Sequence, residues 1–228
     1  MFSSRTLSLS LGLAAVALVS LGAARPASAQ TAIQLFNTGV NNDGTVAALG
    51  SVDQHYTQIT PTGNPSAYLY NFPTYAAPTN SQYISVDANG GNNYMFGFFT
   101  ADYQTTFSLP TLTPSTLVSL SGDWSTDNRG DDILINGHST GLMSPGYGAF
   151  THFDLTPFQN DFQAGTNTLD FVWTNAAGPG AIDVQNLQGT VGAPVPEAST
   201  TVSLGLLLAL GMGGLLVAAK RKKAGSLA

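Results

Sequence analysis

Between residues 30 and 195 the chain contains twelve Asp but no Glu and no Lys, and its single basic residue is Arg129. Glu and Lys favour helices, whereas the β-branched and aromatic residues that are abundant here favour strands. Gly, Asn, Ser and Pro recur between the apolar stretches, and no amphipathic helical period exceeds a turn or two. This segment is therefore expected to fold as an all-β domain with polar loops.

The apolar stretches predict about ten short strands, which turn-forming residues separate. The predicted strands comprise residues 32–37, 52–59, 82–86, 93–99, 103–109, 116–124, 132–136, 150–155, 168–174 and 182–191. Asn89-Gly90-Gly91 predicts a tight turn, residues 61–78 are rich in Pro and predicted to be irregular, and residues 125–131 are predicted to form a polar loop. Many short strands with frequent turns are typical of a β-sandwich or jelly roll.

The charge of this segment excludes one class of partner. Twelve Asp against one Arg give residues 30–195 a net charge of −11, compared with −6 for the whole chain. Nucleic acid is not an expected partner, because binding to phosphates needs clustered Lys or Arg. The chain also has no cysteine, which excludes disulfides, thiol catalysis and cysteine-ligated zinc.

The N-terminal residues 1–29 have the pattern of a secretory signal peptide. Arg5 precedes an apolar stretch over residues 7–24, and Ala27-Ser28-Ala29 offers signal peptidase a small-x-small site just before Gln30. The alternative is an uncleaved membrane anchor.

The C-terminal residues contain three parts in a fixed order. Val195-Pro196-Glu197 lies within the motif at 195–199, an uncharged apolar run covers residues 202–219, and a basic tail covers 220–223. The run has the length of a single transmembrane helix, and Lys or Arg behind such a helix stay on the cytoplasmic side. A permanent single-span anchor is one interpretation.

The ordered combination, over residues 193–223, resembles the PEP-CTERM sorting signal of Gram-negative bacteria, although Ala198 stands where a second Pro is common. The resemblance implies export, transient anchoring in the inner membrane, recognition by an exosortase and cleavage near Pro196-Glu197. The mature protein would then reach the cell surface, outer membrane or extracellular matrix. The family is associated with exopolysaccharide and biofilm.

The second half of the body shows a further resemblance. A strand ending in Asn136-Gly137, an Asp154-x-Thr156 turn and Gly165-x-Asn167 before the next strand are similar to the galactose-binding-like jelly roll, over residues 116–175. The resemblance implies that residues 30–192 form a galactose-binding-like β-sandwich. These residues also have a local reason to be there, because Asn-Gly supplies positive φ and Asp or Thr caps backbone amides at turns.

The densest polar cluster is a candidate calcium site. Asp127, Asp131 and Asp132 lie within six residues, and Ca²⁺ prefers oxygen ligands that are close together. The spacing is not that of an EF-hand, and the alternative is a loop in which Asp and Asn bind backbone amides while Arg129 neutralises a neighbour.

Several residues are candidates for binding a sugar. Aromatic rings can lie under pyranose faces, and carboxylates and amides can bind hydroxyls. The candidates are Trp124, Asp127, Asn128, Asn136 and Tyr147, with Tyr83 as a further ring. Any single ring is also a candidate core residue.

The sequence contains one weak catalytic signature, at residues 137–141. Gly137-His138-Ser139-Thr140-Gly141 matches the Gly-x-Ser-x-Gly nucleophile elbow, but that motif requires a following helix, which residues 142–146 do not favour. We therefore expect a non-catalytic exported protein that associates with extracellular polysaccharide, with a purely structural or adhesive matrix component as the alternative. An extracellular hydrolase is a third hypothesis.

Overall fold

The computed structural model describes residues 30–89 and 98–192. The predicted signal peptide, the sorting signal at 193–223 and most of the predicted strand at 93–99 lie outside these residues. No helix within the described part of the chain combines the length and apolar character needed to cross a membrane.

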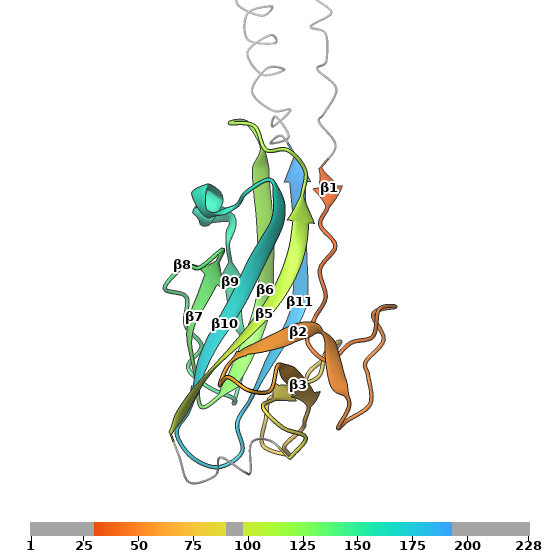
Figure 1. The fold of residues 1–228 in the computed structure, drawn as a ribbon, viewed down its shortest axis with the longest axis vertical. Coiled ribbons are helices and arrows are strands. Elements are labelled where there is room, and N and C mark those ends of the chain that lie inside the picture. Colours follow the sequence, from red (N-terminus) through yellow and green to blue (C-terminus); the bar gives the residue numbers. More distant parts are fainter. Residues whose placement is uncertain (1–29, 90–97, 193–228) are drawn as a thin grey trace, which may run out of the picture.

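The described residues form one antiparallel sheet, which confirms the all-β prediction (Figure 1). Its strands follow the order β8-β7-β10-β5-β2-β3-β4-β11-β6-β9, and β1 pairs with β11. The strands are β1 (Thr31–Ala32), β2 (Val52–Thr60), β3 (Ser66–Leu69), β4 (Ile84–Ser85), β5 (Phe99–Leu109), β6 (Leu117–Asp127), β7 (Arg129–Ile135), β8 (His138–Ser139), β9 (Thr151–Asp154), β10 (Gly165–Asn175) and β11 (Ala181–Gly192). A 3-10 helix, η2 (Thr156–Asp161), is the helix found within the described ranges.

The sheet curls so that β5, β7 and β10 face β6, β9 and β11 across the core (Figure 1). Phe171 of β10 contacts Trp124 of β6 and Phe153 of β9, each with ring centroids 5.8 Å apart. Successive side chains of a strand point to opposite faces, so alternate residues enter the core. Leu169, Phe171 and Trp173 follow this rule in β10, and all three are fully buried.

The segment predicted as a polar loop at 125–131 is instead the junction of two strands. β6 continues to Asp127, which pairs with Ala181, and β7 begins at Arg129, which pairs with Thr174. The prediction was wrong because the polar side chains here satisfy the geometry of a strand end as well as that of a loop. Gly130 is required at this junction, since a Cβ there would lie 2.3 Å from the Trp124 ring.

The turns predicted from the jelly-roll motifs are confirmed. Asn136 and Gly137 have φ values of 52° and 81° and form the two-residue loop between β7 and β8. The Asp154 carboxylate accepts a hydrogen bond of 2.8 Å from the backbone N–H of Thr156. These residues shape the ends of strands, as their local chemistry predicts.

The first and last described strands of the chain, β1 and β11, pair with each other. Thr31 of β1 pairs with Val191 of β11, and Ala32 pairs with Thr190. The predicted signal cleavage point before Gln30 is thus one residue from the first strand, and the predicted sorting signal begins directly after the last one.

Candidate functional site

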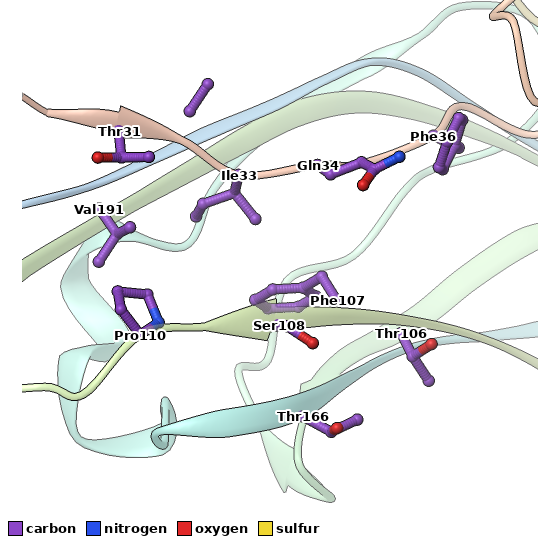
Figure 2. Close-up of a pocket in the computed structure, with 11 residues that line it drawn as sticks. Thr31, Ile33, Gln34, Phe36, Thr106, Phe107, Ser108, Pro110, Thr166 and Val191 are labelled. Atoms are coloured by element: carbon purple, nitrogen blue, oxygen red, sulfur yellow. The ribbon is translucent and has the colours of Figure 1, made fainter.

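A groove of about 640 Å³ lies between the extended segment at 31–36 and the C-terminal end of β5. It opens next to the paired ends of β1 and β11, because Thr31 and Val191 both line it. Figure 2 shows Ile33 and Val191 pointing across the groove toward Phe107 and Pro110. Its volume lies within the range of about 300–1,000 Å³ that is usual for ligand pockets.

The groove exists because two neighbouring strands diverge. β2 pairs with β5 only at Asp102, Tyr103 and Gln104, whereas β10 pairs with β5 along its whole length to Leu109. On the other side, β1 pairs with β11. Residues 105–109 therefore present one strand edge to the groove that pairs with no strand among the described residues.

The lining of the groove is uncharged. Exposed side chains at its rim carry hydroxyl or amide groups, and its floor contains the buried apolar side chains of Ile33, Phe107 and Val191. The polar members are Thr31, Gln34, Thr106, Ser108 and Thr166. Hydroxyls and amides both donate and accept hydrogen bonds, so this surface is suited to a neutral ligand with many hydroxyl groups.

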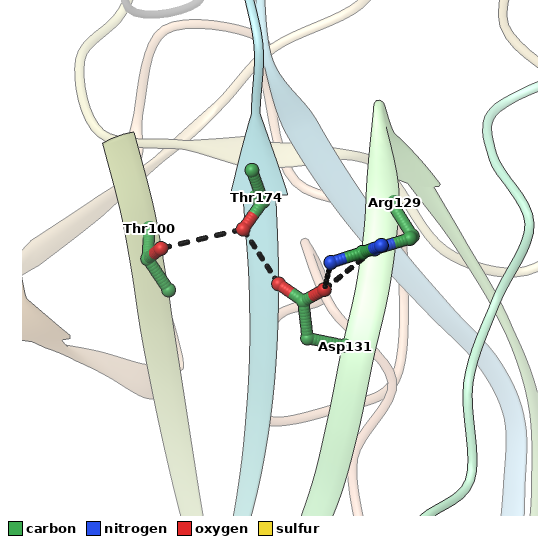
Figure 3. Close-up of polar contacts among 4 residues, drawn as sticks. All are labelled: Thr100, Arg129, Asp131 and Thr174. Carbon is green, nitrogen blue, oxygen red and sulfur yellow. Dashed lines mark hydrogen bonds and ion pairs between the residues drawn. The ribbon is translucent and has the colours of Figure 1, made fainter. Parts of the chain in front are cut away.

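The three carboxylates of the candidate calcium site have different partners in the structure. Asp131 accepts a hydrogen bond of 2.6 Å from Nε of Arg129 and another of 2.6 Å from the hydroxyl of Thr174, which in turn contacts Thr100 (Figure 3). Asp132 accepts hydrogen bonds from Ser139 and from the backbone N–H of Gly141. Asp127 lies in a separate cluster with Tyr75. Within residues 30–89 and 98–192, no group of three or more His, Cys, Asp or Glu side chains is arranged to hold a metal ion.

Two of the predicted sugar-binding residues have structural roles. Trp124 is fully buried against Phe171, so it is not a stacking surface; it shares the inward face of β6 with Val118 and Leu120. The amide of Asn136 is used within the fold. Its Nδ2 donates to Asp161 and Asn167, and its Oδ1 accepts from the N–H of Thr168.

The remaining three predicted residues, Asp127, Asn128 and Tyr147, lie in one region. The ring centroids of Tyr147 and Tyr75 lie 5.7 Å apart. The backbone carbonyl of Tyr147 accepts a hydrogen bond of 2.8 Å from the backbone N–H of Ala76. Asn128 accepts a hydrogen bond of 2.6 Å from the N–H of Ala176. A Cβ at Gly146, next to Tyr147, would lie 3.0 Å from the carbonyl oxygen of Asn128.

We use the name tyrosine corner only for the cluster formed by Tyr70, Tyr75, Tyr83, Tyr147 and Asp127, and not for the motif of that name in immunoglobulin-like domains. Burial raises the pKa of Asp127 to about 6, although the Tyr75 hydroxyl offsets part of this rise. Burial also raises the pKa of Tyr70, Tyr75 and Tyr83, and the negative charge of Asp127 raises each of them further. Sequence reasoning missed Tyr70 and Tyr75 because they lie in the Pro-rich stretch that predicted no regular structure.

The Gly-x-Ser-x-Gly motif forms a hairpin in this chain. Ser139 lies in β8, directly after the Asn136-Gly137 loop, and its hydroxyl donates to Asp132. The chain then runs to Ser144, which forms a bridge with Gly130. The strand–turn–helix arrangement of a nucleophile elbow is therefore not present at this motif.

Comparisons with known proteins returned structural resemblances only. No family model matches the chain, and no curated protein is similar to it in sequence. A Stig cyclase from Fischerella sp. TAU, in complex with (3Z)-3-(1-methyl-2-pyrrolidinylidene)-3H-indole, matches with 12% identity over 74% of this chain and 100% of its own, with a TM-score of 0.42. CBM35 from Paenibacillus barcinonensis matches with 17% identity over 58% of this chain and 91% of its own, with a TM-score of 0.32. A family 35 carbohydrate binding module from an environmental isolate matches with 13% identity over 62% of this chain and 98% of its own, with a TM-score of 0.34. All three TM-scores are below 0.5, and all three sequence identities are below 25%.

Proposed function

We propose that this chain is an exported, non-catalytic surface or matrix protein that binds extracellular polysaccharide. The observation that carries the proposal is the uncharged groove, in which hydroxyl and amide side chains surround an apolar floor. Sugars present the matching chemistry, because their hydroxyl groups form hydrogen bonds while their ring faces are apolar. We assign the curled sheet to the galactose-binding-like β-sandwich class, and the turns at Asn136-Gly137 and Asp154 support that assignment.

We further propose that both ends of the precursor are removed or processed. Signal peptidase would cleave between Ala29 and Gln30, and an exosortase would act at Val195-Pro196-Glu197 after the apolar run at 202–219 has anchored the precursor in the inner membrane of a Gram-negative bacterium. The pairing of Thr31 with Val191 supports this scheme, because the two described strands that are nearest in sequence to the proposed cleavage points lie side by side.

A glycan panel tests the proposed function. The purified protein is screened against neutral and uronate-containing polysaccharides, each with Ca²⁺ and with a chelator. We expect binding to neutral polymers and weaker binding to uronates, because the body carries a charge of −11 that repels anionic chains. A protein that binds no polysaccharide under any of these conditions is not a glycan-binding protein of this kind.

A pair of variants tests the site. Gln34 is exposed at the rim of the groove, and Gln188 is exposed on β11 outside it. Gln34→Ala is expected to weaken neutral-glycan binding about fivefold, since a neutral hydrogen bond contributes about 1 kcal/mol. Gln188→Ala is the matched control and should leave the affinity unchanged. Equal affinities for both variants and the wild type would mean that the glycan binds elsewhere.

A structural matrix component without glycan specificity is the second candidate. The observation that favours it is the open β5 edge at residues 105–109, because an unpaired strand edge can pair with another chain. This candidate predicts concentration-dependent oligomers that a charge at the edge, such as Thr106→Lys, disperses. Sedimentation of the wild type and of Thr106→Lys at several concentrations measures this. If both proteins are monomers at every concentration, the matrix-component candidate is rejected.

A further inference from the structure

The tyrosine corner contains a buried carboxylate without a full set of partners. The side chain of Asp127 is 7% exposed, and the Tyr75 hydroxyl lies close enough to lower its pKa, but its Oδ1 atom has no hydrogen-bond partner in the part of the chain that the structure describes. Buried polar atoms in proteins are nearly always hydrogen-bonded, so an unpaired carboxylate oxygen indicates a missing partner. A charged oxygen in a poorly solvated position favours a cationic partner in particular.

This carboxylate lies close to a cluster of aromatic rings, because its negative charge raises the pKa of Tyr70, Tyr75 and Tyr83. Tyr75 is the central ring, with its centroid 4.7 Å from Tyr83, 5.6 Å from Phe72, 5.7 Å from Tyr147 and 6.3 Å from Tyr70. Tyr147 is 38% exposed and Tyr75 is 8% exposed, so the cluster reaches from the surface to the interior. The faces of such rings attract cations through their quadrupoles, and the attraction increases where water is excluded.

Within the described residues, no Lys or Arg side chain pairs with this carboxylate. Residues 30–195 contain no Lys, and their single Arg, Arg129, is bound to Asp131 at 2.5 Å. The body therefore combines a charge of −11 with a buried carboxylate next to an aromatic cluster. Both features attract a positively charged ligand, the first over a distance and the second at contact.

We propose that the tyrosine corner binds the protonated amine of an amino sugar, with the ammonium group on the Asp127 carboxylate and the sugar against Tyr147. The second part rests on the proposed function, because the polysaccharide that the protein binds would supply the sugar. The site is separate from the groove, which Thr31, Phe107 and Pro110 line at the end of β5. A neutral chain would bind in the groove and a cationic sugar unit in the corner.

Calorimetric titration of the full chain, exported by a bacterial host and purified in mild detergent, tests this site. The probes are a glucosamine oligomer, the same oligomer fully N-acetylated, and ethylammonium. Acetylation removes the positive charge and keeps the sugar, so the acetylated oligomer, which can still bind in the groove, is expected to bind the corner at least about tenfold more weakly, which corresponds to 1.4 kcal/mol. Binding at the corner is the part that Asp127→Asn weakens. Equal Asp127-dependent binding of the two oligomers would overturn the proposal, and ethylammonium binding as tightly as glucosamine would overturn the assignment to a sugar.

Two isosteric variants separate the site from the general charge of the protein. Asp127→Asn and Asp161→Asn each remove one negative charge, but Asp161 lies in η2, away from the corner. We expect Asp127→Asn to weaken glucosamine binding about tenfold and Asp161→Asn to leave it unchanged. Equal losses in both variants would assign the binding to the general field and reject the site.

A third variant keeps the test valid if Asp127→Asn does not fold. The Tyr147 side chain is partly exposed, so Tyr147→Ala should fold and still weaken glucosamine binding. Unchanged binding in a folded Tyr147→Ala protein counts against the proposal. Neutral-glycan binding that depends on Gln34 should persist in all three variants. Loss of neutral-glycan binding alone, with glucosamine binding retained, would contradict the proposed function but not the proposed amine site at the tyrosine corner.

Discussion

Asp183 makes the stability of this fold depend on pH in an unusual direction. It lies in β11, is fully buried and accepts a hydrogen bond of 2.6 Å from the hydroxyl of Ser81. Burial raises the pKa of Asp183 to about 7, whereas the ordinary value is 3.8. Most carboxylates of folded proteins have a lowered pKa and stabilise the fold at neutral pH; this one does the opposite.

The sign and size of the effect follow from proton linkage. Between pH 4 and pH 7 the unfolded chain has released this proton while the native protein keeps it, so raising the pH favours unfolding. A difference of about three pKa units, at 1.36 kcal/mol for each, gives a loss of about 4 kcal/mol of unfolding free energy between pH 4 and pH 8. Burial also raises the pKa of Asp102 and Asp127 to about 6, which adds a loss in the same direction.

The substitution Asp183→Asn isolates this contribution, because Asn resembles the protonated acid and does not titrate. Urea unfolding, followed by the fluorescence of the buried Trp124 and Trp173, gives the unfolding free energy at each pH. We expect the variant to gain about 4 kcal/mol relative to the wild type between pH 4 and pH 8. Asp161→Asn, which removes a charge at the less buried η2, should follow the wild type. Parallel curves for wild type and Asp183→Asn across this range would show that Asp183 does not have a raised pKa in the folded protein.

Three further predictions address packing, a turn and processing. Gly130→Ala should destabilise the fold by about 1–3 kcal/mol in urea unfolding, because its Cβ would meet the Trp124 ring at 2.3 Å, whereas Gly148→Ala meets no atom within 4 Å and should be neutral. Asn136→Ala should lower the unfolding temperature, since three hydrogen bonds of its amide, each worth about 1 kcal/mol, hold the turn after β7; an unchanged temperature would contradict this role. Mass spectrometry of the secreted protein should find Gln30 at its N-terminus, and an intact Met1 would instead indicate an uncleaved anchor.

The sequence predicted the strands and the turns better than it predicted the site. Asn136-Gly137 is a local signal, because a two-residue loop with positive φ has few compatible residues, and the structure confirms it. Trp124 could have been recognised as a core residue, since it has the same parity as Val118 and Leu120 along β6. The groove could not have been predicted, because it depends on where β2 leaves β5 in space.

The acidic residues of the body are all Asp, and this helps to explain why the described residues contain no group of three or more acidic or His side chains arranged to hold a metal ion. A short carboxylate can reach backbone amides a few residues away, which a longer Glu side chain does less well. Asp53 accepts hydrogen bonds from the N–H groups of His55 and Tyr56, and Asp132 accepts one from Gly141. The same use of the carboxylate recurs at Asp43, Asp87 and Asp154. These side chains are occupied by the chain's own turns, so a count of acidic residues overstates the number available to a ligand. Asp127 differs from them, because it is buried and its Oδ1 has no hydrogen-bond partner among the described residues, a property that it shares with one oxygen each of Asp102 and Asp183.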